Sequence, residues 1–573
     1  MKDKREFFRL LEEIDGQPIS QYEQLIGDYD FTRCVAKCYP FTPSFDNLEP
    51  VFSIRIPQTI AEIPHSLFDN PIRKTALEDF LLRRFNNTIA GLTEFNFEGV
   101  ALKSINLSSP NQSILPRNAL FINQEYLELR ITIELPIQKI IIENELQWVI
   151  DGARAQSLFF EDLIESVGNS LLYCSMDNGL AEAFVNNMED ADQLRQHLNA
   201  SGQVAFIANN AILGGSNQED DNNLKANACI KIEDNIQEEV NTPYFGSVNG
   251  LGISNGLTLI IGEDNEGRIE LVDTIAQGIY NHILGDGREH CVTASDTVEI
   301  IEEQGRSIQN VDISAFYNDD DKSNFSTEFA SAFESQAAST VEALEAGARV
   351  LLFDEATSCP SFLSSDSRTS EILVKSKYSP LASRARQMID ELGLSIIVSG
   401  SNLIAEYIPI ADRILKIEGL LVTDITEDAK SINVQPPVTG TNISLTGLFT
   451  RSRWIMPSSI DPSIKHKDVF INVDDDGLLQ FGRSIIDMNH FSQIVSEDQI
   501  RSIGLIIYYA KLRYMDEGYS LKEILDLVDR DLSNEGLNAL AREFCGNLAR
   551  PRRYEVAALL NRLPAFRVSH VTQ

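Results

Sequence analysis

Four short apolar segments in the middle of the chain constrain the fold more than any other feature of the sequence. They alternate with stretches of helical pattern and read QVAFIAN (203–209), LTLIIG (257–262), RVLLFDE (349–355) and LSIIVSG (394–400). Strands that are apolar along their whole length are buried on both faces, which is typical of a parallel sheet covered by helices on each side. The sequence therefore predicts an α/β fold for the central region.

The segment that precedes this region mixes two kinds of pattern. Residues 71–89 place apolar side chains at helical spacing, and residues 157–174 also have a helical pattern. Residues 126–135 alternate apolar and polar side chains, as a half-buried strand does. These patterns predict an N-terminal domain that is also α/β.

Local composition suggests where the domains end. A polar, acidic stretch at 215–245 predicts a surface excursion such as a hairpin, and the sequence NVQPPVTGTN (433–442) predicts a linker. A chain of 573 residues suggests roughly three or four domains. We predict an N-terminal α/β domain over 1–165, a central domain over 166–445 and a small, mainly helical C-terminal domain over 446–573.

The charge and the cysteines restrict the class of protein. The chain has 85 Asp and Glu against 48 Lys and Arg, a net charge of −37, which argues against a protein whose whole surface binds nucleic acid or an anionic membrane. A local basic patch stays open. No apolar run is long enough for a transmembrane helix, and the start of the chain lacks the apolar core of a secretory signal. The seven scattered cysteines fit reduced thiols. We expect a cytoplasmic protein.

The strand at 257–262 leads into a pair of glycines with the spacing of a phosphate-binding loop. Gly262 and Gly267 are five residues apart, as in G-x-x-x-x-G-K-[ST], and a predicted helix follows them. In that motif, backbone N–H groups hold phosphate, the Lys neutralises it, and the hydroxyl residue binds Mg²⁺. Here the Lys position is Arg268, and the hydroxyl position is Ile269, which has no oxygen to bind a metal.

The residues between the two glycines are acidic. Glu263, Asp264 and Glu266 occupy three of the four positions. A carboxylate about 5 Å from a phosphate charge, at an effective dielectric of about 20, costs about 3 kcal/mol. The loop is therefore expected to bind ATP weakly. From spacing alone, an ordinary strand, acidic turn and helix would explain the pattern equally well.

A second strand ends in a pair of carboxylates. The segment RVLLFDEA ends with Asp354 and Glu355, the Walker B pattern, in which the Asp orients Mg²⁺ and the Glu activates the attacking water. The alternative interpretation is a buried strand whose last residues happen to be acidic.

Several segments together resemble the predicted soluble ABC-class ATPases that are not attached to transporters, a family that includes a mitochondrial factor associated with RNA editing. The resemblance covers nearly the whole chain, and its segments are RKTALEDFLLRRF (73–85), QVAFIANNAIL (203–213), GISNGLTLIIG (252–262), GIYNHILGDGREHCVT (278–293), GRSIQNVDISAF (305–316), NFSTEFASAFESQAASTVEALEAGARVLLFDEATS (324–358), VTDITEDAKSI (422–432) and LARPRRYEVAALLNRL (548–563).

The resemblance implies a P-loop NTPase domain of the ABC type between an N-terminal α/β domain and a helical C-terminal domain. It also implies that ATP and Mg²⁺ bind at an interface completed by a signature motif, which makes a homodimer through this domain the expected assembly. Glu355 would then be catalytic, Asp354 would hold Mg²⁺, and Gly262, Gly267, Arg268 and Ile269 would form the nucleotide loop.

The signature motif departs from the family. The family reads roughly S-G-S-T-S-Q, and the aligned residues are Ser331, Ala332, Phe333, Glu334, Ser335 and Gln336. The flexible Gly and two hydroxyl residues are thus replaced, and we expect Glu334 to direct a carboxylate at the γ-phosphate. Ser331, Ser335 and Gln336 remain candidates for weak nucleotide contact.

The last segment carries three arginines that follow the family. Arg550, Arg552 and Arg553 would contact either RNA phosphates or acidic side chains of the protein itself, within or between subunits. The sequence leaves both alternatives open.

Three functions are consistent with these observations. The first is an ABC-class ATPase-like protein with a degraded nucleotide site, a pseudo-ATPase that serves as a scaffold or binding protein. The second is an active ATPase in which Arg268 replaces the Lys, although a forked guanidinium is not equivalent to a compact ammonium. The third is an RNA-binding protein that uses the C-terminal arginines. We also expect Glu355→Gln to affect folding little, on the assumption that Glu355 faces an empty cleft.

Overall fold

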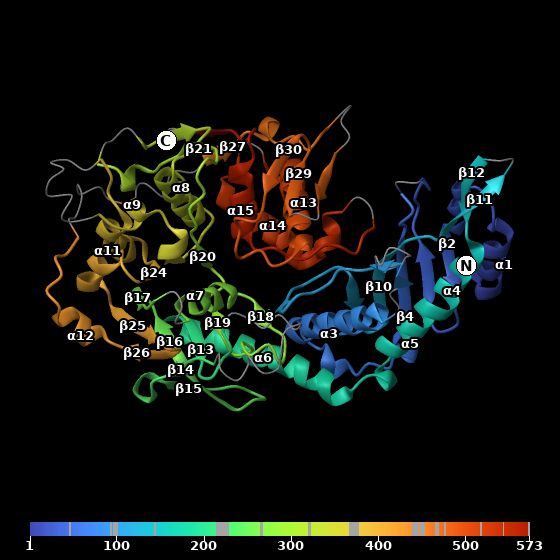
Figure 1. Cartoon of the computed structure of the whole chain (residues 1–573), viewed down its shortest axis with the longest axis horizontal. Helices are drawn as coiled ribbons and strands as arrows, with labels where there is room; N and C mark the ends of the chain where they lie inside the picture. The colour runs from blue at the N-terminus through green and yellow to red at the C-terminus, as the bar shows by residue number, and fades with distance from the viewer. Residues whose placement is uncertain are drawn as a thin grey trace. The chain divides into compact units, whose positions relative to one another are not determined.

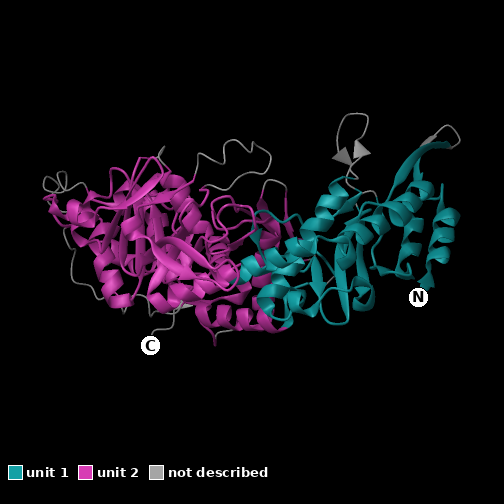
Figure 2. Cartoon of the chain, turned by 90° about the horizontal axis from the view of Figure 1, so that it is seen from below, with its two compact units in different colours: residues 1–189, 535–550 teal, residues 190–534, 551–573 magenta. Residues whose placement is uncertain are grey.

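The computed structural model describes residues 1–44, 47–91, 94–95, 101–102, 104–142, 145–213, 229–263, 267–318, 322–365, 377–437, 445, 453–464, 469–474, 477–515, 518–541 and 544–570. Asp264 and Glu266 of the acidic loop lie outside these residues, as do residues 214–228 of the acidic stretch and 438–442 of the predicted linker. The chain divides into two compact units, one of Met1–Glu189 and Glu535–Arg550 and one of Asp190–Asn534 and Pro551–Gln573 (Figure 2).

The first unit is built on a mixed sheet with the order β1-β2-β3-β4-β10-β7, and β9 also pairs with β10. The bounds are β1 (Lys2–Asp3), β2 (Gly27–Asp30), β3 (Val35–Cys38), β4 (Val51–Pro57), β7 (Ile105–Asn106), β9 (Leu120–Ile122), β10 (Tyr126–Ile133), α1 (Lys4–Ile14), α3 (Pro71–Ala90), α4 (Gly152–Ser157) and α5 (Ile164–Ser170). The predicted helix at 71–89 and strand at 126–135 are confirmed. The helix α3 begins where Asn70 accepts hydrogen bonds from the N–H groups of Ile72 and Arg73.

A late segment of the chain completes this unit. The side chain of Asn118 donates to the carbonyl of Cys545 at 2.9 Å and accepts from the N–H of Leu548 at 2.9 Å. Because an Asn side chain both donates and accepts, one residue satisfies two backbone groups of the returning segment.

The second unit contains a seven-stranded sheet in which every neighbouring pair is parallel except β25 with β26. Its order is β14 (Lys231–Ile232), β26 (Leu421–Asp424), β25 (Arg413–Glu418), β17 (Leu257–Ile261), β24 (Ser395–Gly400), β23 (Val350–Asp354) and β20 (Thr297–Glu299). Three of the four apolar segments are therefore central parallel strands, as predicted.

The fourth apolar segment belongs to a different sheet. The strand β13 (Gln203–Ala208) pairs antiparallel with β16 (Ser247–Ser254) and β19 (Val292–Thr293), and β15 (Glu238–Asn241) pairs with β16. The prediction of a parallel strand here was wrong. The strand is apolar throughout because one of its faces packs on the large sheet and the other on the helix α6 (Asn178–Ser201).

The large sheet is covered on both faces, as predicted. Leu257 and Leu259 of β17 pack toward α8 (Ala332–Glu345), α9 (Pro360–Leu363) and α11 (Leu381–Leu392). Ile260 packs on the opposite side, in the core that it shares with α7 (Arg268–Gln277) and the antiparallel sheet. Figure 1 shows α7 close to this antiparallel sheet. Side chains of a strand alternate between its two faces, so one apolar strand contributes to both cores.

The C-terminal part of this unit combines helices with small sheets. Its elements are β27 (Arg453–Ile455), β28 (Ile471–Val473), β29 (Leu478–Phe481), β30 (Ser484–Asp487), α13 (Glu497–Arg513), α14 (Leu521–Glu535), α15 (Arg553–Arg562) and β31 (Val568–His570). The predicted domain boundaries at 165/166 and 445/446 stay predictions. The second of them lies beside residues that the structure does not describe.

Gln493, in the loop before α13, joins the C-terminal part to the sheet. Its side-chain amide donates to the carbonyls of Ala276 at 3.0 Å and Thr297 at 3.4 Å. Its side-chain oxygen accepts from the N–H of Glu299 at 3.1 Å and from Arg552 at 2.9 Å. Gln493 is 5% exposed, so water cannot readily replace these bonds.

We predict that Gln493→Ala lowers the free energy of unfolding by about 2–4 kcal/mol, because several buried groups lose their hydrogen-bond partner. Urea denaturation measures the change. His490→Ala in the same loop is the control, since the His490 side chain is 51% exposed and its loss should cost at most about 0.5 kcal/mol. Equal effects of the two substitutions would contradict the anchoring role of Gln493.

Candidate nucleotide site

Three neighbouring strands end together at one edge of the large sheet. Asp354, the last residue of β23, lies opposite Ser399 of β24, and Ile261 of β17 lies opposite Gly400. The strands are parallel, so the loops that follow them leave from the same edge. The register therefore brings the candidate phosphate loop and the Walker B carboxylates to one place.

Arg268 turns into this edge and forms an ion pair with Asp354. The helix α7 begins at Arg268, directly after Gly267, whose φ of 90° is a left-handed conformation that favours glycine. The Arg268 guanidinium donates to the Asp354 carboxylate and to the Ser399 hydroxyl, the latter at 2.7 Å. Arg268 is 1% exposed and Asp354 is 3% exposed. The cation at the phosphate position and the carboxylate at the metal position thus neutralise each other.

The next residue of the loop motif points elsewhere. Ile269 is 40% exposed, so an apolar side chain stands at the solvent where a hydroxyl would hold a metal. Glu263, the described acidic residue of the loop, is exposed.

Glu355 is held by backbone amides. One of its carboxylate oxygens accepts hydrogen bonds from the N–H groups of Ser401 at 2.7 Å, Asn402 at 2.9 Å and Leu403 at 3.3 Å. A Cβ at Gly400 would lie 2.3 Å from the same oxygen, so this approach requires glycine. The expectation that Glu355 faces an empty cleft was wrong, because the turn after β24 wraps around its carboxylate.

Glu334 is likewise bound by its own surroundings. Ser331 caps the helix α8 by accepting from the N–H of Glu334 at 3.3 Å, and the Glu334 carboxylate accepts from the Ser331 N–H at 3.1 Å, which completes a capping box. Tyr317 and Lys322 contact the other carboxylate oxygen at 3.4 and 3.7 Å. Burial acts to raise the pKa of Glu334, but the Ser331 bonds and the Lys322 charge outweigh it and lower the pKa. Glu334 serves as a helix cap, and the expectation that it is directed at a phosphate stays a prediction.

The other signature residues are buried. Ser335 and Gln336 are 0% exposed; the Ser335 hydroxyl accepts from the N–H of Glu303 at 2.9 Å, and the Gln336 side chain accepts from the N–H of Cys359 at 2.8 Å. Phe333 is 3% exposed and its ring lies 4.1 Å from that of Tyr378. These residues hold the loops around α8 in place, and their polar groups are engaged within the domain.

Two of the C-terminal arginines form internal ion pairs. Arg552 pairs with Glu555 and donates to the carbonyl of Thr297 at 2.7 Å, and Arg553 pairs with Asp526. The backbone N–H of Arg550 donates to the carbonyl of Pro116 at 2.9 Å. Of the two alternatives for this segment, these contacts favour salt bridges within the chain for Arg552 and Arg553.

Several residues of the site were not identified from the sequence. Ser399 binds Arg268, the amides of 401–403 bind Glu355, and Gly400 leaves room for the Glu355 carboxylate. Nothing in their residue types distinguishes them from an ordinary turn. They could have been suspected only from their position, because the segment LSIIVSG is an apolar strand like the Walker B strand and ends in two small residues.

Comparisons with known families identify the class of protein. Residues 177–448 match the P-loop domain model of ABC ATPases, and residues 4–174 match the model described as ATPase of the ABC class N-terminal. Residues 471–569 match the MRB1590 C-terminal domain. The chain is an ABC-class P-loop protein with an N-terminal domain and a C-terminal domain that contains helices. It belongs to the ABC-class ATPase family whose C-terminal domain is named after MRB1590.

Solved structures of transporter ATPases also align with the chain. CbiO1 from Clostridium perfringens, part of the ABC transporter complex CbiONQ, is 12% identical over 39% of this chain and 87% of its own, with a TM-score of 0.23. A bacterial Atm1-family ABC exporter with ATP bound is 13% identical over 39% of this chain and 38% of its own, with a TM-score of 0.22. No curated protein matches the chain. Within the described residues, no helix has both the length and the apolar character needed to cross a membrane.

We predict that Asp354→Ala lowers the free energy of unfolding by about 3–5 kcal/mol, because it leaves the Arg268 charge buried without its partner. Urea denaturation measures the loss, and Glu263→Gln, which removes an exposed carboxylate from the same loop, is the control. The double substitution Arg268→Met with Asp354→Leu should recover most of the loss, since apolar side chains can replace a buried pair. A single-variant loss no larger than that of the control would show that the pair does not stabilise the domain.

Glu355→Gln is expected to lower the free energy of unfolding by about 1–2 kcal/mol, because the neutral amide oxygen accepts the three N–H groups more weakly than a carboxylate does. Glu355→Ala should cost more, since it removes the acceptor altogether. Thermal and urea denaturation of both variants, again beside Glu263→Gln, test this order. Indistinguishable stabilities of Glu355→Ala and the native protein would contradict it.

Proposed function

We propose that this chain is a pseudo-ATPase, an ABC-class protein that acts in the cytoplasm as a scaffold or binding protein without turning over ATP. The observation that carries the proposal is the buried ion pair between Arg268 and Asp354. The P-loop family implies ATP and Mg²⁺ binding in general.

The residues present do not fit Mg·ATP. Phosphate would need the Arg268 guanidinium, which already binds Asp354 and Ser399. Mg²⁺ would need the Asp354 carboxylate and a hydroxyl, and the hydroxyl position holds Ile269. Ligand binding would have to break a pair that is shielded from water, and each partner alone is costly to bury.

The competing function is an active ATPase in which Arg268 swings out to meet phosphate. Breaking the buried pair would cost about 3–5 kcal/mol of the binding free energy. Because every 1.4 kcal/mol is a factor of about ten in affinity, this cost would weaken the binding of ATP more than about a hundredfold. Glu263 adds repulsion at the mouth of the loop, so the geometry favours the pseudo-ATPase.

Homodimer formation through the P-loop domain, if it occurs, would not depend on ATP under this proposal. The signature residues that would cap a nucleotide are engaged within their own domain, with Glu334 bound to Ser331. The RNA-binding alternative loses support for the same kind of reason, since Arg552 and Arg553 are already paired with carboxylates.

We expect Mg·ATP to bind with a dissociation constant weaker than about 1 mM, measured by calorimetry on the full chain. Arg268→Lys with Ile269→Ser should not yield hydrolysis at about 1 s⁻¹, a low enzymatic rate, because the introduced Lys still faces Asp354 and the Glu263 carboxylate remains. Adding Glu263→Gly should improve nucleotide binding beyond that pair. A dissociation constant below about 10 μM for the native protein would overturn the proposal.

Light scattering after size exclusion tests the same proposal through assembly. The native protein and Glu355→Gln are each compared with and without Mg·ATP. In a working ABC-type site the variant would trap ATP and become a stable dimer, whereas here the mass of both proteins should be independent of ATP. Dimer formation that requires both the variant and ATP would establish a functional site instead.

A further inference from the structure

The second unit contains a cavity with a volume of about 70 Å³ beside the C-terminal half of α8, the helix that begins within the signature motif. It is lined by residues of α8, of the segment that begins in β20, of the loop before α13 and of α15. Its apolar wall includes Ile300 and Ala343, and the rings of Phe491 and Tyr554 also line it. The cavity therefore offers both an apolar surface and two aromatic rings to a small molecule.

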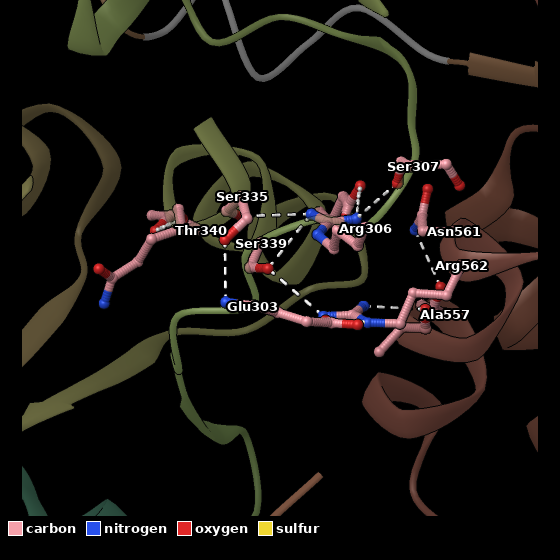
Figure 3. A network of polar contacts seen from close by, with 12 residues as sticks. Glu303, Arg306, Ser307, Ser335, Ser339, Thr340, Ala557, Asn561 and Arg562 are labelled. Carbon is pink, nitrogen blue, oxygen red and sulfur yellow. Dashed lines mark hydrogen bonds and ion pairs between the residues drawn. The ribbon is translucent and has the colours of Figure 1, made fainter. Parts of the chain in front are cut away.

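Two of the four glutamates that line the cavity have arginine partners in the network that Figure 3 shows around Arg306 and Arg562. Glu303 pairs with Arg562 at 2.6 Å, and Glu342 pairs with Arg306 at 2.9 Å. Figure 3 shows Arg562 extending from α15 toward Glu303, beside the Ser339 side chain of α8. The charges of these two glutamates are thus neutralised inside the protein.

The third glutamate, Glu555, pairs with Arg552, but the fourth has no such partner. Glu299 accepts one hydrogen bond, from the Ser492 hydroxyl to its Oε2 atom. Among the residues that the structure describes, no Lys, Arg or His lies within ion-pair distance of Glu299. Its Oε1 atom accepts no hydrogen bond from them either. Burial, together with the charges of Asp273 and Asp354, raises the pKa of Glu299 to about 7.

No cationic side chain among the described residues balances the negative charge of the Glu299 carboxylate. Burying an acid without a cation is costly, and that cost is removed when a cationic ligand binds beside it. The two rings are suited to the apolar portion of such a ligand, because aromatic side chains offer a large apolar surface. Phe491 and Tyr554 already receive Arg562 and Arg552 at 4.7 and 5.1 Å from the ring centres.

We propose that this cavity binds a small organic cation, with a protonated amine beside Glu299 and an apolar or aromatic portion against Phe491 and Tyr554. The paired glutamates make the rest of the wall nearly neutral, so a ligand with one positive charge is favoured. The apolar wall favours an organic cation over a hydrated metal ion, which would have to lose its water without gaining oxygen ligands there. The site is separate from the Arg268–Asp354 pair and does not depend on the pseudo-ATPase proposal.

Calorimetry on the full chain tests this with 2-phenylethylamine and with 2-phenylethanol, which has a similar shape and no charge. We expect the amine to bind at least tenfold more tightly than the alcohol. Glu299→Gln should weaken amine binding at least tenfold, because it removes the charge and keeps an oxygen for Ser492. Glu302→Gln removes a carboxylate three residues away that does not line the cavity, and it should change the affinity less than twofold.

Several results would overturn the proposal. They are equal affinities of amine and alcohol, equal affinities of the native protein and Glu299→Gln, or no amine binding at 10 mM ligand. If Glu299→Gln unfolds, as circular dichroism would show, the comparison of amine with alcohol on the native protein still decides between the outcomes.

Discussion

The ion pair of Arg268 with Asp354 determines what the carboxyl edge of the large sheet can do. It connects the first residue of α7 to the last residue of β23, and Ser399 adds the end of β24 to the same contact. In a site arranged for a ligand, a cation and a carboxylate stay apart because the ligand lies between them. Here the two side chains bind each other directly, so neither charge is left buried without a partner.

The C-terminal part of the second unit makes further polar contacts of this kind within the chain. Gln493 binds the end of α7 through the carbonyl of Ala276, and Arg453 pairs with Glu345 at the end of α8 and donates to Asn561 of α15 at 2.8 Å. The helices α7 and α8 are therefore both attached to the C-terminal part of the unit, through different elements. Buried arginines with two or more partners restrict movement strongly, because any displacement breaks several charged hydrogen bonds at once.

The sequence predicts a structural feature correctly where that feature depends on the residue types along one helix or strand. The apolar runs located β17, β23 and β24, and the glycine at 267 located the start of α7. It fails where the feature depends on contacts with segments that are distant in the sequence. The run at 203–209 is apolar in either kind of sheet if both faces are covered, and the burial of β13 could not reveal its antiparallel partners. Likewise, Arg268 and Glu355 were recognised, but their partners at 399–403 come from another strand and are backbone groups or a small hydroxyl.

The return of residues 535–550 to the first unit also affects how the protein is made. The chain passes between the two units after residues 189, 534 and 550, so the first unit lacks residues 535–550 until they too have left the ribosome. Asn118 must wait for Leu548, which at about 5–20 residues per second is a delay of about 20–90 s. During that interval the first unit exists with an open place for a segment not yet synthesised, and the second unit likewise waits for Pro551–Gln573, which leave the ribosome after that segment.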